Sequence, residues 1–397
     1  MANMFINRDI NGVSVATRLH ILASERYVPS ADRNIFGVIR IRRHTRSVLE
    51  KPSRESTLIL PSKDMVIVRG GVEDLASPED GTVEIDATTA SAGCGMLPYT
   101  EYRDLQASTD PTFKNDYDRL INDHRILFTS GIHEPIHFLP WHRYFILLYD
   151  NLLRRVDCRV TVPYWDWSRV SGDPFRTNPT DLWHSGNAGF GGNGVAPNGC
   201  VQTGPFRESI WSLPPPPAGA PTEPGPRCLR RRFNGNPPDL VAVNRVLQIN
   251  LVNFTDFELL LRINLHDVVH CLIGGTMCFN DSASAPEFFL HHGFIDKIWD
   301  DWQKRSDAHL NVFFPNINEV MPGTQVFPRE VVDLSSQPGG VRAEYQQPKS
   351  PVRPSSGQGH NQQRRRFSSL NAKVIRVFHI KSTEVSKAME MAKMLQP

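Results

Sequence analysis

The sequence of 397 residues predicts a mainly α protein whose core is a four-helix bundle, with long loops and a few peripheral strands. Three observations predict this class. Four segments repeat apolar residues with the helical period of 3.6. All seven tryptophans lie between Trp141 and Trp302, which marks one apolar core. Eight of the fourteen histidines cluster at 124–142 and 266–292, within or next to those four segments.

The first two predicted helices carry histidine on their apolar faces. In the segment 113–128, one face consists of Tyr117, Leu120, Ile121, His124 and Phe128. After Pro140, the face consists of His142, Phe145, Ile146, Tyr149, Leu153 and Val156.

The last two predicted helices repeat this arrangement. In the segment 253–273, the face consists of Leu259, Ile263, His266, His270 and Ile273. In the segment 286–303, it consists of Phe288, His292, Ile295, Trp299 and Trp302. Because all four faces should turn toward one core, the histidines should meet there.

Composition divides the chain into three expected parts. Residues 1–94 form a polar N-terminal extension of unknown role, with short β-branched runs at 57–60 and 65–68. Residues 95–345 form the core domain, which includes a proline-rich loop at 213–226. Residues 346–397 are expected to be a flexible basic tail and C-terminal segment.

The bulk composition excludes several classes of protein. A net charge of +2 argues against nucleic-acid binding by broad electrostatics. The sequence contains no apolar run of the ~20 residues that a membrane helix requires. No signal peptide is visible at the N-terminus as given, although the sequons at Asn253 and Asn280 favour export.

The six cysteines permit three disulfides, for which fifteen pairings exist. Cys200 and Cys228 are the favoured pair, because both lie in polar loop sequence rich in proline and glycine. Cys271 lies on a predicted core helix and could equally be a buried thiol.

Several imidazoles that share one core each need a polar partner, and a metal ion supplies one. His266 and His270 are four residues apart, which places both rings on one helical face. No carboxylate or thiolate obviously joins these nitrogen ligands. An all-imidazole site favours copper, although zinc, iron and nickel also bind imidazole.

Two motifs resemble those of the tyrosinase and catechol oxidase family of type 3 copper proteins. The first is HEPIHFLPWHR at 133–143, followed by PYWDW at 163–167. The second is HDVVH at 266–270, then IGG at 273–275 and FFLHH at 288–292. The resemblance covers about residues 95–345.

This resemblance implies two copper ions in a dinuclear type 3 centre, with O2 as co-substrate. By position, the implied ligands are His124, His133, His142, His266, His270 and His292. His137 and His291 fall at non-ligand positions. Gly131 occupies the place where some relatives carry a cysteine for a thioether, so no thioether is expected.

The implied reaction is oxidation of o-diphenols, and in some relatives of monophenols, to o-quinones through a peroxo-dicopper intermediate. Asp267 and Glu258 are candidate catalytic carboxylates, as a base and as a group that orients water. Phe279 is a candidate gate over the substrate. The alternatives are an oxygen carrier resembling hemocyanin and a catalytically silent structural copper protein. The expected partners are a small phenol and dioxygen, with no nucleic acid, no membrane span and no prediction of oligomeric state. Family, cysteines and sequons favour secretion.

Overall fold

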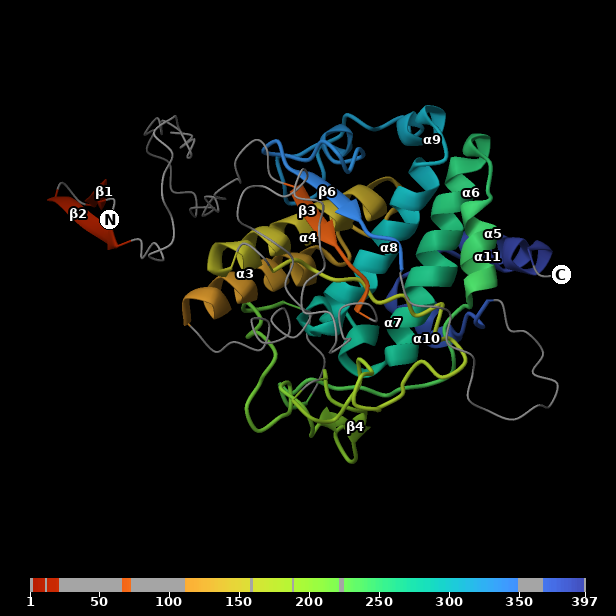
Figure 1. The fold of residues 1–397 in the computed structure, drawn as a ribbon, viewed down its shortest axis with the longest axis horizontal. Helices are drawn as coiled ribbons and strands as arrows, with labels where there is room; N and C mark the ends of the chain where they lie inside the picture. The colour runs from red at the N-terminus through yellow and green to blue at the C-terminus, as the bar shows by residue number, and fades with distance from the viewer. Residues whose placement is uncertain are drawn as a thin grey trace. The chain divides into compact units, whose positions relative to one another are not determined.

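The computed structural model describes residues 3–10, 13–20, 66–72, 111–157, 160–187, 189–220, 225–348 and 367–395 (Figure 1). The chain forms two compact units, Met1–Ser53 and Arg54–Pro397. In the smaller unit, strands β1 (Asn3–Ile10) and β2 (Val13–His20) pair as an antiparallel hairpin.

The larger unit is mainly helical. Its longer helices are α3 (Pro111–Leu127), α4 (Pro135–Val156), α5 (Leu240–Leu247), α8 (Glu287–Gln303) and α11 (Ser382–Met394). Its shorter helices are α6 (Phe254–Leu259), α7 (Val268–Ile273), α9 (Asp307–Asn311) and α10 (Ala372–Val377). Single helical turns lie at Leu251–Asn253, Gly275–Cys278 (η3), Ser282–Ser284 and Pro328–Glu330. Its strands are β3 (Val66–Arg69), β4 (Gly194–Val195), β5 (Cys200–Val201) and β6 (Arg342–Tyr345).

The four helices predicted from apolar periodicity form the core and pack against one another (Figure 1). They are α3, α4, the run from α6 to α7, and α8. All four contribute residues to one buried cluster, among them Ile121, Phe145, Leu265 and Phe288. The prediction of a mainly α protein with a helical bundle core is confirmed.

Helix α4 begins earlier than predicted. It starts at Pro135, a residue whose fixed φ suits the first turn, and it continues through Pro140. Pro140 lacks an N–H and so removes one backbone bond near the helix start. Nearly every residue from Phe138 to Leu153 is buried, and this packing keeps the helix continuous.

The third predicted helix is interrupted by a π-helix, η2 (Leu260–Asp267), between α6 and α7. A π-helix has i→i+5 hydrogen bonds and is rare outside functional sites. Its last two residues are His266 and Asp267, so the irregular backbone lies where the site was predicted.

Strand β3 pairs in parallel with β6 from the far end of the core domain. Arg69, at the end of β3, is buried and pairs with Asp150 at 2.6 Å. Residues 66–72 therefore belong to the larger unit, whereas the sequence assigned them to the polar extension. The run at 57–60 lies outside the described residues.

The C-terminal segment 367–395 forms α10 and α11 and packs on the bundle, with α11 against η2. It buries Val374, Phe378, Ile380 and Ala388 in one apolar cluster with residues of the third helix. The sequence made no prediction for the fold of residues 370–395, and the flexible basic tail expected at 347–369 lies mostly outside the described residues. The sequence gives only a short apolar run here, which does not show what it packs against.

Two disulfides lie within the described ranges. The predicted bridge Cys200–Cys228 is confirmed. Cys271 is not a free thiol but is bonded to Cys278. Cys94 and Cys158 lie outside the described residues. None of the described helices combines the length and apolar character that crossing a membrane would need.

Candidate metal centre

The first histidine triad brings together two helices and the loop between them. His124 comes from α3, His133 from the loop and His142 from α4. One nitrogen of each lies within 4.8 Å of the other two. The three rings surround a common point, with centroids 5.1–5.6 Å apart.

The second triad is tighter. His266 ends the π-helix, His270 lies on α7 and His292 on α8. The Nε2 atoms of His266 and His270 each lie 3.1 Å from Nε2 of His292. Two imidazole nitrogens that bind one ion at about 2.0 Å stand roughly 3 Å apart, so this spacing fits a shared ion.

The two triads adjoin each other. The rings of His142 and His292 stack with centroids 4.6 Å apart, and the His142 and His266 rings are 6.1 Å apart. The His133 and His266 rings are also 6.1 Å apart. The six predicted ligands therefore form one cluster of two adjacent groups.

Acceptors behind the rings fix the tautomers of four histidines. Nδ1 of His133 lies 3.0 Å from the Phe128 carbonyl and Nδ1 of His142 lies 2.8 Å from that of Phe138. Nδ1 of His270 lies 2.8 Å from the Met277 carbonyl. A carbonyl can only accept, so each Nδ1 carries the proton and leaves Nε2 free to bind an ion. In the fourth, His266, the acceptor is the Asp267 carboxylate.

Burial keeps all six imidazoles neutral. It lowers the pKa of His133 to about 4 and the pKa of the other five well below the ordinary value. Charged neighbouring imidazoles would lower the pKa values of those five further. Neutral imidazole is the form that binds metal.

The donor set fits copper. Both ring nitrogens of His124 and Nε2 of His142 are buried and lack a hydrogen-bond partner. Such groups are costly to bury unless something pairs with them, and an ion would do so. Each triad offers three neutral nitrogens without a carboxylate or thiolate, which suits copper. A third grouping, Cys200, Glu208 and Cys228, offers no thiolate because its two sulfurs form a disulfide.

Two neighbouring histidines stand outside the triads, as the sequence predicted. His137 is only partly buried and joins neither group. The ring of His291 is buried, and its Nδ1 accepts a hydrogen bond from Trp167 Nε1 at 3.1 Å. Arg143, next to His142 in the chain, forms a buried ion pair with Asp296 at 2.6 Å.

The two candidate catalytic carboxylates have different surroundings. Asp267 Oδ1 lies 2.7 Å from Nδ1 of His266, so it contacts a predicted ligand. Glu258 forms an ion pair with Arg262 at 2.6 Å, and Arg262 in turn pairs with Glu384 of α11. Among the described contacts of Glu258, none reaches a histidine. The role of Glu258 in orienting water stays a prediction without support from its contacts.

The aromatic residue that contacts the triads from the C-terminal segment is Phe378. Its ring centroid lies 5.8, 5.6 and 5.4 Å from those of His133, His266 and His270. Phe279 is partly exposed and makes no ring contact with these histidines in the described structure. Sequence reasoning missed Phe378, because nothing in its local pattern links it to motifs so distant in the chain.

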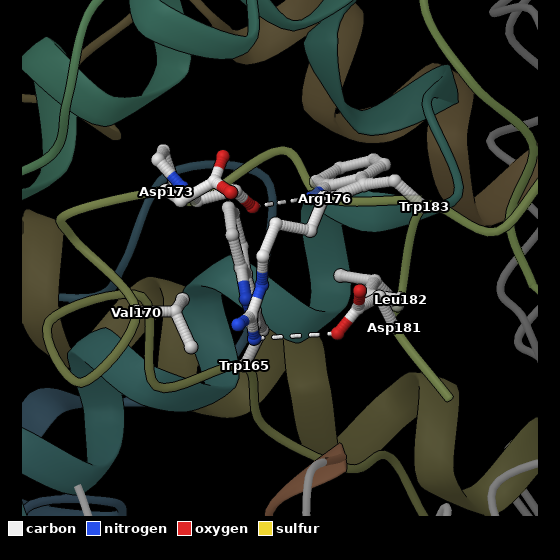
Figure 2. A pocket seen from close by; sticks show the side chains of 8 residues that line it. Trp165, Val170, Asp173, Arg176, Asp181, Leu182 and Trp183 are labelled. Carbon is white, nitrogen blue, oxygen red and sulfur yellow. Dashed lines mark hydrogen bonds and ion pairs between the residues drawn. The ribbon is translucent and has the colours of Figure 1, made fainter. Parts of the chain in front are cut away.

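A small surface pocket lies elsewhere, lined by Trp165, Val170, Asp173, Pro174, Arg176, Asp181, Leu182 and Trp183 (Figure 2). Figure 2 shows Arg176 reaching across it to Asp181, an ion pair of 3.3 Å. None of the six triad histidines lines this pocket. It is therefore separate from the candidate metal centre.

The fold and the site together define a helical protein with a dinuclear, all-histidine metal centre. A family model described as the common central domain of tyrosinase matches residues 114–305. Tyrosinase from Streptomyces lincolnensis is 34% identical over 212 residues, which cover 48% of this chain and 73% of that protein. Tyrosinase from Streptomyces antibioticus is 33% identical over 210 residues, with the same two coverages.

A solved structure of recombinantly expressed latent aurone synthase, a polyphenol oxidase, aligns with a TM-score of 0.39 and 16% identity. The alignment covers 80% of this chain and 64% of that one, so the chain spans slightly less than two thirds of that protein. This chain belongs to the tyrosinase family. The cofactor of that family is a pair of copper ions, and the two triads are the groups that can hold them.

Proposed function

We propose that this protein oxidises o-diphenols to o-quinones, with two diphenols and one O2 giving two quinones and two water molecules. The observation that carries the proposal is the pair of adjoining, buried triads of neutral imidazoles. His124, His133 and His142 would hold one copper ion, and His266, His270 and His292 the other. Bound copper would supply the transfer of electrons from phenol to dioxygen.

The side chains of the protein do the remaining work. The carbonyls of Phe128, Phe138 and Met277 hold three imidazoles in the tautomer that leaves Nε2 free. The apolar rings around the histidines exclude water, which protects reactive oxygen species from side reactions. Phe288, for example, stacks on His292 with ring centroids 3.9 Å apart. Oxidation of monophenols is not part of the proposal.

The test compares the wild-type chain with His124→Ala and His137→Ala, each loaded with copper. We expect two coppers per wild-type chain, catechol-dependent O2 uptake, and the absorbance of the quinone. His124→Ala should bind fewer than two coppers and form no quinone, whereas His137→Ala should behave as wild type. A wild-type chain that binds fewer than two coppers would contradict the proposed site.

One observation favours the alternative of an oxygen carrier. The Phe378 ring lies beside three of the six histidines, where it would obstruct a phenol more than dioxygen. Two coppers per chain with reversible O2 binding and no quinone, in both the wild type and Phe378→Ala, would support the carrier. Quinone formation by either would support the oxidase.

A further inference from the structure

We propose that the Cys271–Cys278 disulfide is a positioning element for the copper ligand His270. The bridge joins α7 to η3. It lies next to the hydrogen bond between His270 Nδ1 and the Met277 carbonyl. This inference rests on the proposed role of the second triad as a copper site.

The hydrogen bond and the disulfide involve consecutive residues on both sides of one turn. Nδ1 of His270 donates to the carbonyl of Met277, at 2.8 Å. Cys271 follows the donor directly and Cys278 follows the acceptor directly. Their Cα atoms lie 4.6 Å apart. The bridge therefore ties together covalently the two backbone segments that carry the donor and the acceptor.

The turn between them depends on two glycines in the left-handed region. Gly274 has φ 69° and Gly275 has φ 55°, conformations that residues with a side chain rarely adopt. A Cβ on Gly275 would also lie 2.2 Å from the Arg230 carbonyl oxygen. Backbone hydrogen bonds from Gly274 N to the His270 carbonyl and from Thr276 N to the Arg230 carbonyl hold this flexible turn. The disulfide adds a covalent constraint next to the Met277 carbonyl.

Holding that carbonyl determines which nitrogen of His270 can bind an ion. With Nδ1–H donated to Met277, the lone pair is on Nε2, which lies 3.1 Å from Nε2 of His292. Groups that orient a metal ligand in this way typically contribute about 10- to 100-fold to metal affinity.

A general stabilising effect on the fold explains the Cys271–Cys278 bridge less well than a positioning role does. The entropic contribution of a disulfide grows with the length of the loop it closes. The separation is 7 residues for Cys271–Cys278 and 28 for Cys200–Cys228. Cys200–Cys228 is therefore the matched control, because it should stabilise the fold more while leaving the histidines untouched.

The experiment uses the full chain with both cysteines of one bridge replaced, since a single free thiolate would itself bind copper. Cys271→Ser with Cys278→Ser is compared with Cys200→Ser with Cys228→Ser and with the wild type. Copper per chain is measured against a competing chelator, and electron paramagnetic resonance detects uncoupled Cu(II). Urea unfolding of the copper-free chains measures stability.

In the Cys271→Ser, Cys278→Ser variant we expect the affinity for one of the two coppers to fall by about 10- to 100-fold. Isolated Cu(II) should then give an electron paramagnetic resonance signal. The control pair should lose more stability yet retain both coppers. If the serine pair fails to fold, Cys271→Ala with Cys278→Val fills the same apolar space without the bond. The inference alone would be overturned if the Cys271/Cys278 double variant that folds, serine pair or Ala/Val pair, bound both coppers with wild-type affinity. A wild type with fewer than two coppers would overturn the proposed site as well.

Discussion

The carboxylate of Asp267 lies 2.7 Å from Nδ1 of its own chain neighbour, His266. Both side chains are buried, and the second oxygen of Asp267 has no hydrogen-bond partner. Burial raises the pKa of this carboxyl well above its usual value. A carboxylate behind a histidine ligand orients the ring and makes it a stronger ligand. We infer that Asp267 acts on His266 rather than on the phenol.

Replacing Asp267 separates these two roles. Asp267→Asn keeps an oxygen that can accept from Nδ1, and Asp267→Ala removes it. We expect Asp267→Ala to lower the affinity of the His266, His270 and His292 triad for copper by about 10- to 100-fold. Asp267→Asn should change this affinity little. Titration against a chelator measures the affinity. If Asp267→Asn instead lost kcat with both coppers bound, the carboxylate would be acting as the base.

The C-terminal segment is held over the metal centre by both packing and charge. Phe378 lies beside His133, His266 and His270, and the next residue, His379, has φ 51°. Arg262 pairs with Glu384 on α11 at 2.6 Å. These contacts place an apolar ring against three of the six triad histidines.

We therefore expect Phe378→Ala to raise kcat/KM for catechol by about tenfold or more. Truncating a buried phenylalanine removes about 3–5 kcal/mol of packing. The loss removes the ring from beside the three histidines and weakens the packing of the segment on the bundle. Steady-state kinetics at matched copper content would measure the change. Val374→Ala is the control, because Val374 packs in the same apolar cluster but carries no aromatic ring. Equal gains in both variants would mean that loosening the segment, not removing the ring, admits substrate.

The helices and four of the six candidate ligands were predictable because the signals are local. A period of 3.6 residues identifies a buried helical face, and His142, His266, His270 and His292 lie on such faces within recognisable motifs. His133 lies in a loop and was predicted only through the resemblance. His124 was predicted from its helical face and, through the resemblance, from its position, and the structure groups it with His133 and His142.

Three features could not be predicted from the sequence, because they depend on three-dimensional contacts or on small changes in the backbone. The π-helix at 260–267 leaves the apolar pattern almost unchanged, because one wider turn is absorbed within the long helical run. The partner of Cys271 is set by the turn at Gly274, and cysteine spacing does not determine pairing. Phe378 reaches the site only because the C-terminal segment packs back on the bundle.

Asp166, in the segment between α4 and the proline-rich loop, is a buried carboxylate that lies outside the triads. Its Oδ1 accepts a hydrogen bond from Ser168 Oγ at 2.5 Å. Burial raises the pKa of Asp166 from 3.8 to about 6, although the Ser168 bond opposes the shift. Because the folded pKa is the higher one, the folded state binds the proton more tightly than the unfolded state.

The contribution of Asp166 to the free energy of unfolding should therefore fall as the pH rises from about 4 to about 6 and then level off. A shift of roughly two units corresponds to about 3 kcal/mol. Asp166→Asn keeps an acceptor for Ser168 and cannot ionise. Its free energy of unfolding should therefore lack this pH-dependent decrease. Urea unfolding of copper-free chains should show equal stability near pH 4 and an advantage of up to about 3 kcal/mol for Asp166→Asn near pH 7. A difference between the two chains that does not change with pH would mean that Asp166 keeps an ordinary pKa in the folded protein.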